Sequence, residues 1–206
     1  MKTYAFIDAS NLFYGGEKSL GWKVDYKKML EYLKEKYAVT KAFYFAGVEL
    51  DGYKYSLLDN DDLDLDELLK FQLGKLRRKD ISEAEVVVLG KHIQKTKFYR
   101  KLRLFGYVLR LRPVKVYWNE DKPVKKANCD VDMTFEMMLL KDKFGGLVAM
   151  SGDGDFVPVL KYMKDEGKKL VILARGERAA KEIKRLGGKD FRDFGYLREL
   201  LKYEDK

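Results

Sequence analysis

Short apolar runs alternate with amphipathic segments along most of the chain, and each run is followed by polar or turn residues. The clearest runs lie at 3–8, 42–48, 147–150 and 170–173. Between them, apolar residues recur at helical spacing, as they do after Asp25, which is placed to cap a helix. Short buried strands that alternate with helices are typical of a mainly parallel sheet. The sequence therefore predicts an α/β fold, a three-layer α/β/α sandwich of the Rossmann-like kind.

We predict a single domain over 1–206, with a partly helical insertion at about 50–90. A chain of 206 residues buries enough apolar surface to fold without disulfides or a structural metal. Within the insertion, leucines at helical spacing follow an acid-rich stretch at 59–67, and we interpret these acids as electrostatic support for a helix N-terminus. Residues 85–89 are expected to form another strand.

Cys129 and His92 are the only cysteine and the only histidine, and this limits the possible metal sites. A single cysteine excludes an internal disulfide, and a Cys/His zinc site cannot be assembled. A catalytic metal would therefore have to bind oxygen atoms. We expect Cys129 to be an inert thiol and His92 to be an ordinary surface residue.

The sequence contains no apolar run of the roughly 20 residues that cross a bilayer, and its amino end has no apolar signal-peptide core. We therefore expect a soluble, cytoplasmic protein without a membrane partner. Homodimerisation is an open expectation, because the sequence does not determine the oligomeric state.

Positive charge is concentrated between residues 91 and 126. This segment holds twelve Lys and Arg against two acids, a balance of +10, whereas the whole chain carries +9. It also contains six aromatic residues, and such a mixture of cations and rings binds phosphates and stacks bases. A solvated helix face is the simpler interpretation, but the concentrated excess favours a nucleic-acid surface. The predicted RNA-binding residues are Lys95, Lys97, Arg100, Lys101, Arg103, Arg110, Arg112, Lys125 and Lys126.

Three short motifs, FIDASN, NCDVD and MSGDGDF, place acids after predicted strands or at the start of a helix. In a parallel sheet, ligands bind beyond the carboxyl ends of the strands. A carboxylate that ends a buried strand, as Asp8 does, costs several kcal/mol unless it is paired, hydrogen-bonded or bound to a cation. The candidate site residues are Asp8, Ser10, Asn11, Asp130, Asp132, Glu136, Ser151, Asp153 and Asp155.

Each acid also has a simpler explanation. Asp130, Asp153 and Asp155 could cap helices, and Asp132 and Glu136 could face solvent. Gathered together, however, like-charged carboxylates repel each other unless a divalent cation neutralises them. Mg²⁺ or Mn²⁺ suits oxygen ligands, and it could generate hydroxide, hold a phosphodiester and stabilise the leaving oxygen.

The ordered set of FIDASN, CDVD with Glu136 on the same helix, and SGDGDF resembles the NYN domain family, a branch of the PIN-like nucleases that includes LabA-like proteins. The resemblance covers roughly 1–50 and 95–198. It implies a metal-dependent ribonuclease on a parallel sheet flanked by helices. It further implies that the metal ligands are Asp8, Asp130 and Asp153, with Asp155 as a fourth candidate, and that Asn11 and Ser151 position metal-bound waters or the phosphate.

The chain departs from the family pattern at Glu136, where the family commonly has aspartate. The leading hypothesis is a Mg²⁺- or Mn²⁺-dependent ribonuclease that acts on single-stranded RNA or unpaired regions, with Lys125 and Lys126 near the scissile phosphate. A non-catalytic RNA-binding regulatory module is the first alternative. A phosphatase of the haloacid dehalogenase type is the second, although that chemistry needs an aspartate where this chain has Ser10.

Overall fold

The computed structural model describes residues 2–13, 18–59, 62–119 and 122–204. The chain divides into two compact units, the first formed by Met1–Phe45 and Cys129–Lys206 and the second by Ala46–Asn128. The second unit is therefore longer than the insertion expected at about 50–90. The single domain over 1–206 stays a prediction.

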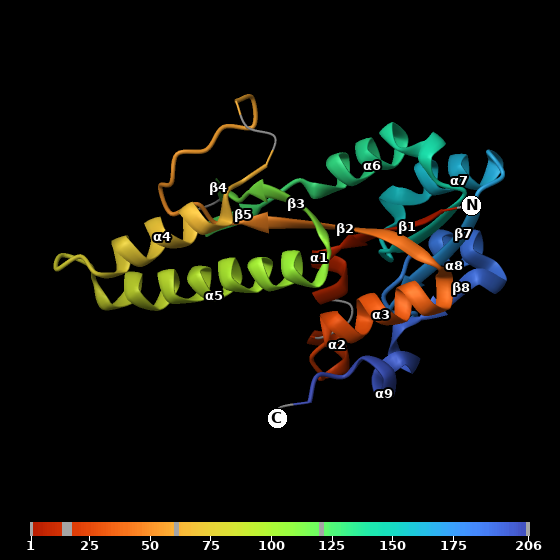
Figure 1. The fold of residues 1–206 in the computed structure, drawn as a ribbon, viewed down its shortest axis with the longest axis horizontal. Helices are drawn as coiled ribbons and strands as arrows, with labels where there is room; N and C mark the ends of the chain where they lie inside the picture. Colours follow the sequence, from red (N-terminus) through yellow and green to blue (C-terminus); the bar gives the residue numbers. More distant parts are fainter. Residues whose placement is uncertain (1, 14–17, 60–61, 120–121, 205–206) are drawn as a thin grey trace. The chain divides into compact units, whose positions relative to one another are not determined.

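A six-stranded sheet has the strand order β3-β2-β1-β6-β7-β8. β1 pairs with β2 and β6, β6 pairs with β7, and β7 pairs with β8; all four pairings are parallel (Figure 1). The predicted α/β fold with a mainly parallel sheet is confirmed. The strands are β1 (Thr3–Asp8), β2 (Val39–Val48), β3 (Val108–Pro113), β6 (Gly146–Met150), β7 (Lys169–Ala174) and β8 (Phe191–Asp193).

The strand order reverses between β1 and β6. From β1 the chain continues to β2 on one side, whereas β6 is followed by β7 and β8 on the other side. The carboxyl ends of the two central strands therefore form a topological switch point, where α/β sheets bind ligands. This point lies within the first unit and places Asp8 beside the residues that follow Met150.

Helices cover both faces of the first unit's strands, with α6 and α7 on one side and α3 on the other (Figure 1). The helices are α1 (Ala9–Asn11), α2 (Lys18–Leu20), α3 (Tyr26–Tyr37), α6 (Cys129–Leu139), α7 (Val157–Asp165), α8 (Lys181–Gly187) and α9 (Arg198–Leu201), with 3₁₀ turns η2 (Lys141–Lys143), η3 (Gly154–Phe156), η4 (Gly188–Asp190) and η5 (Phe194–Leu197).

Local signals explain where α3 begins and what it buries. Asp25 is its N-cap, as predicted, because the carboxylate accepts hydrogen bonds from the backbone N–H groups of Lys27 and Lys28. Met29 and Leu33, four residues apart, point into the core and are fully buried. None of the helices in the described ranges is both long and apolar enough to cross a membrane.

In its described residues, the second unit contains two helices and an antiparallel hairpin. Its elements are α4 (Leu65–Leu76), α5 (Glu83–Phe105), β4 (Lys115–Asn119) and β5 (Lys122–Lys126), with β3 preceding the hairpin. Asp64 caps α4 and the next two acids lie in its first turn, so the acid-rich stretch does support the helix N-terminus. The backbone N–H groups of Glu67 and Asp66 hold the pKa of Asp64 below its usual value.

The strand expected at 85–89 is wrong, because these residues belong to α5. Ser82 and Glu85 form a capping box in which each side chain accepts the other's backbone N–H group. Leu89 and Ile93, one helical turn apart, then pack against Leu69 of α4. This helical packing outweighs the strand preference of the valines in the segment.

His92 does not lie on the surface as predicted, because its side chain is only 13% exposed. Its Nδ1 lies 2.7 Å from Asp51 Oδ1, and Gln72 donates to the other oxygen of the same carboxylate at 2.7 Å. Thr96 completes this buried network by donating to Gln72 Oε1. The histidine therefore helps to join α4 and α5 to the loop after β2 within the second unit.

Candidate active site at the switch point

Asp8 ends β1 and is 5% exposed. Its Oδ1 accepts hydrogen bonds from the Ser10 backbone at 3.0 Å, the Ser10 hydroxyl at 2.7 Å and the Asn11 backbone at 3.1 Å. Asp8 is therefore the N-cap of the short helix α1. In the described part of the chain, no lysine, arginine or histidine forms an ion pair with this buried carboxylate, so its charge is balanced by hydrogen bonds alone.

Ser151 links Asp8 to the loop that follows β6. Its hydroxyl donates to Asp8 Oδ2 at 3.1 Å and accepts the backbone N–H of Asp153 at 3.2 Å. Ser151 is 1% exposed, so this bridge is shielded from water. The structure thus brings together Asp8, Ser10, Ser151 and Asp153, four predicted site residues from two motifs that are far apart in the sequence.

Asn11 provides a second link between the two motifs. Its Oδ1 accepts the backbone N–H of Gly152 at 2.9 Å. A Cβ at Gly152 would lie 2.9 Å from the backbone Cα of Ala179, so the loop can pack this closely only with glycine here. The position of the Asp153 backbone is therefore held by Asn11, Ser151 and tight packing together.

Asp153 is the N-cap of η3, and its Oδ1 accepts the backbone N–H of Asp155 at 3.0 Å. Asp153 therefore caps a helix, as the simpler explanation proposed. Its Oδ2 has no hydrogen bond from the described residues. Asp155 is exposed. Of the two acids in SGDGDF, Asp153 is the one connected to Asp8 through Ser151.

Asp130, Asp132 and Glu136 lie on α6, the first two in its first turn. The helix lies against β1, η3 and α7, which places it beside the elements that carry Asp8 and Asp153. All three acids have interaction partners. Across the described ranges, however, no group of three or more His, Cys, Asp or Glu side chains is arranged to hold a metal ion. The metal-ligand set of Asp8, Asp130 and Asp153 therefore stays a prediction.

The side chains at the switch point do fit an ion that keeps most of its waters. Mg²⁺ is usually bound through one or two carboxylates together with waters and substrate phosphates. Asp8 supplies a buried carboxylate with no basic partner among the described residues, and Asp153, whose backbone N–H donates to Ser151, carries a second carboxylate on the loop after β6. Two carboxylates and bound water are a suitable donor set for Mg²⁺ or Mn²⁺.

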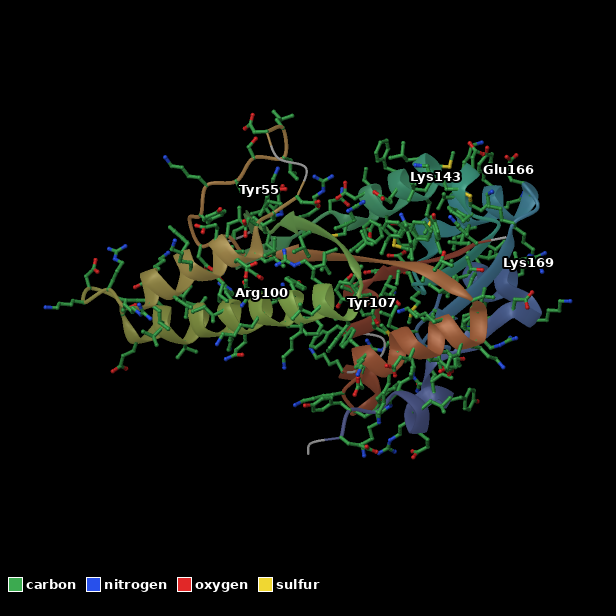
Figure 2. All side chains as sticks on the ribbon, viewed as in Figure 1. Tyr55, Arg100, Tyr107, Lys143, Glu166 and Lys169 are labelled. Carbon is green, nitrogen blue, oxygen red and sulfur yellow. The ribbon has the colours of Figure 1, made fainter. Side chains whose placement is uncertain are left out.

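Several of the predicted RNA-binding cations have acidic partners within the second unit. Arg100, labelled in Figure 2, and Arg103 both pair with Asp66, at 2.6 and 2.8 Å. Lys95 lies 3.1 Å from Glu49. Arg110 lies 3.9 Å from an exposed acid, Asp62, and Arg112 is half-buried, whereas Lys97 and Lys101 are exposed. The side chains of Lys125 and Lys126 lie outside the described part of the structure.

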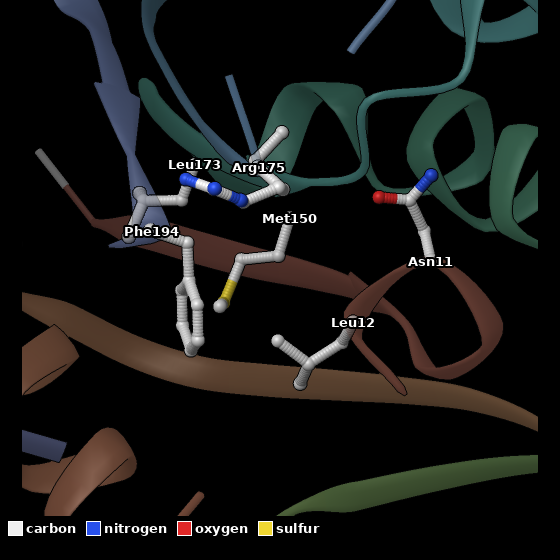
Figure 3. Close-up of a pocket in the computed structure, with 7 residues that line it drawn as sticks. Asn11, Leu12, Met150, Leu173, Arg175 and Phe194 are labelled. Carbon is white, nitrogen blue, oxygen red and sulfur yellow. The ribbon is translucent and has the colours of Figure 1, made fainter. Parts of the chain in front are cut away.

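Arg175 is a candidate that the sequence reasoning missed. It follows β7 directly, and it lines a small pocket together with Asn11 (Figure 3). The only sequence signal was its place at the carboxyl end of a predicted parallel strand, the edge where ligands bind.

The fold and this site define an α/β domain with a carboxylate site at the switch point of a parallel sheet. The chain belongs to the NYN domain family, whose model matches residues 2–188. This confirms the family resemblance seen in FIDASN, CDVD and SGDGDF.

Individual relatives are distant. The chain is 21% identical over 184 residues to the Low amplitude and bright protein LabA of Synechococcus elongatus, covering 87% of this chain and 76% of that protein. A Vibrio parahaemolyticus protein of unknown function, VPA0982, has a similar fold, with a TM-score of 0.57 at 14% identity over 94% of this chain and 93% of that one. The T5 D15 protein, co-crystallised with metal ions, matches with a TM-score of 0.46 and 13% identity over 86% of this chain and 56% of that one.

Proposed function

We propose that this protein is a Mg²⁺- or Mn²⁺-dependent ribonuclease that hydrolyses phosphodiester bonds in single-stranded or unpaired RNA. The observation that carries the proposal is the buried Asp8 carboxylate, joined through Ser151 to Asp153 at the switch point of an NYN domain. Four hydrogen bonds offset part of the cost of burying this carboxylate, and a bound cation would balance its negative charge.

In this proposal, Asp8 and Asp153 hold the ion, and Asp130 contributes from α6 as the third acid. When bound, the ion supplies an activated water and stabilises the leaving oxygen. Ser151 and Asn11 keep the two carboxylates in position through their hydrogen bonds to Asp8 and to the loop after β6. Asp155, Ser10, Asp132 and Glu136 are supporting residues. The cytoplasmic location and a homodimer stay predictions.

The test is cleavage of end-labelled single-stranded RNA in Mg²⁺, Mn²⁺ or EDTA. We expect EDTA to abolish cleavage and Asp153→Asn to slow it by about 100-fold or more, because a metal contributes several kcal/mol to the transition state. Asp165→Asn is the matched control, since Asp165 is exposed and pairs with Lys161 on α7. Cleavage that is equal in wild type and Asp153→Asn, or unaffected by EDTA, would overturn the proposal.

One observation favours the alternative of a non-catalytic RNA-binding module. Among the described residues, three acids are not gathered around one point as a complete metal site would require. The same assay separates the two functions. RNA binding without cleavage in Mg²⁺ and in Mn²⁺ would establish the binding module and exclude the ribonuclease.

Lys97 and Lys101 are two exposed cations of α5 that no described acid neutralises. We expect the double substitution to glutamine to weaken RNA binding and to reduce the slope of log affinity against log salt by about 1.4, because each single-strand phosphate contact contributes about 0.7. The measurement is fluorescence anisotropy in EDTA at several salt concentrations. The matched control replaces Lys34 and Lys36, which are exposed on α3, by glutamine. If both double substitutions weaken RNA binding equally, α5 is excluded as the RNA surface.

A further inference from the structure

Arg175 is a largely buried cation, and only some of its N–H donors have an acceptor. Its side chain is 17% exposed. Nη2 donates to Glu177 Oε2 at 2.7 Å, but Nη1 lies 3.6 Å from Asp193 Oδ2, which is too long for a hydrogen bond. Arg175 Nε is buried and has no acceptor among the described residues. Buried donors are almost always paired, so an unpaired Nε–H group at this place is unusual.

The guanidinium lines a pocket with space for about one water-sized group, and Figure 3 shows Arg175 extending over Met150 and Phe194. A charge-assisted hydrogen bond is strengthened by surroundings of low polarity. An anionic oxygen would fit this space and would receive the hydrogen bond of Arg175 Nε–H. Besides Arg175, the pocket is lined by Asn11, Leu12, Met150, Leu173, Ala174 and Phe194.

Asn11 connects this pocket to the carboxylates. It lines the pocket, and its Oδ1 also accepts the backbone N–H of Gly152, the residue between Ser151 and Asp153. The pocket and the Asp8–Ser151–Asp153 network therefore share one side chain at the same edge of the sheet. Asn11 thus belongs both to the lining of the pocket and to the hydrogen bonds that hold the loop after β6.

Two glycines make room for Arg175 and its acidic neighbour. A Cβ at Gly195 would lie 2.8 Å from Arg175 Nη1, and a Cβ at Gly176 would lie 2.5 Å from Asp193 Oδ2. Contacts this short would displace both side chains.

We propose that Arg175 forms a phosphate subsite that holds a non-bridging oxygen of an RNA phosphate, at the same edge of the sheet as the carboxylates. This inference rests on the proposed ribonuclease function. Nε–H would donate to this oxygen, which supplies the acceptor that the buried donor lacks. An internal phosphodiester and a terminal 5′-phosphate both offer such an oxygen.

The test measures binding in EDTA, so that no cleavage occurs, with short oligoribonucleotides carrying a 5′-hydroxyl or a 5′-phosphate. Arg175→Lys keeps the charge and its attraction to Asp193 and Glu177 but removes the Nε–H donor. We expect it to lower RNA affinity about 10-fold, the loss typical of a hydrogen bond to a charged group. Arg185→Met, at an exposed arginine on α8, is expected to bind as wild type does. The unfolding temperature without RNA should be equal in wild type and Arg175→Lys.

The two substrates distinguish the source of the phosphate. A loss confined to the 5′-phosphorylated RNA assigns the subsite to a terminal phosphate, and an equal loss on both RNAs assigns it to an internal phosphodiester. Wild-type affinity of Arg175→Lys for both RNAs, or a loss explained by a lower unfolding temperature, would overturn the subsite. Wild type that binds RNA but never cleaves it would overturn the ribonuclease proposal and leave the subsite standing.

Discussion

Replacing Asp8 by asparagine is expected to lower the metal-dependent cleavage rate by about 10³-fold while the fold is retained. The rate falls because the negative charge that would hold the metal is lost at the centre of the network. The fold is retained because asparagine is also a good N-cap, so its Oδ1 can still accept the Ser10 and Asn11 donors. Its Nδ2 would face the Ser151 hydroxyl, which can rotate to accept a hydrogen bond.

Two measurements on the same protein check this expectation: initial cleavage rates in Mn²⁺ and Mg²⁺, and the free energy of unfolding in urea. The free energy of unfolding of Asp8→Asn should lie within about 1 kcal/mol of the wild-type value. Asp165→Asn makes the same chemical change at an exposed carboxylate and should leave the rate unchanged. Full cleavage by Asp8→Asn would remove Asp8 from the active site, and a loss of stability as large as the loss of activity would assign it a purely structural role.

The sequence predicted the main features of the site because they depend on one local rule. Residues that follow buried parallel strands meet at one edge of the sheet, so Asp8 and Ser151 are expected at the same edge once both strands are recognised. The bridge through Ser151 and the packing at Gly152 depend on pairing between β1 and β6, and these strands lie 143 residues apart at the Asp8–Ser151 contact. Periodicity in the sequence does not encode which strands pair.

The errors have the same physical origin. His92 was placed on the surface because its partner, Asp51, is 41 residues away and its neighbours in sequence are polar. Arg100 and Arg103 counted fully toward the basic excess because their shared partner, Asp66, is on another helix. The strand expected at 85–89 is wrong even though Ser82 and Glu85 carry a capping-box signal that is visible in the sequence.

Phe6→Ala is expected to lower the free energy of unfolding by about 3–5 kcal/mol. Phe6 is fully buried in β1, with its ring stacked on Phe43 at 5.2 Å and edge-on to Phe144 at 5.7 Å. Side chains two residues apart on a strand point to the same face, so Phe6 packs on the face of β1 that also carries Asp8. The cavity left by alanine would loosen the strand that positions the carboxylate.

The measurement is urea unfolding followed by circular dichroism, with Phe135→Ala as the matched control. Phe135 lies on α6 and is 63% exposed, so the same substitution there should change the free energy of unfolding by less than about 1 kcal/mol. If Phe6→Ala does not fold, Phe6→Leu, which leaves a smaller cavity, provides the comparison at the same position. Equal losses at Phe6 and Phe135 would show that the stacked rings of β1 and β2 are not the main stabilising contact of the first unit, and that another part of the core holds Asp8 in place.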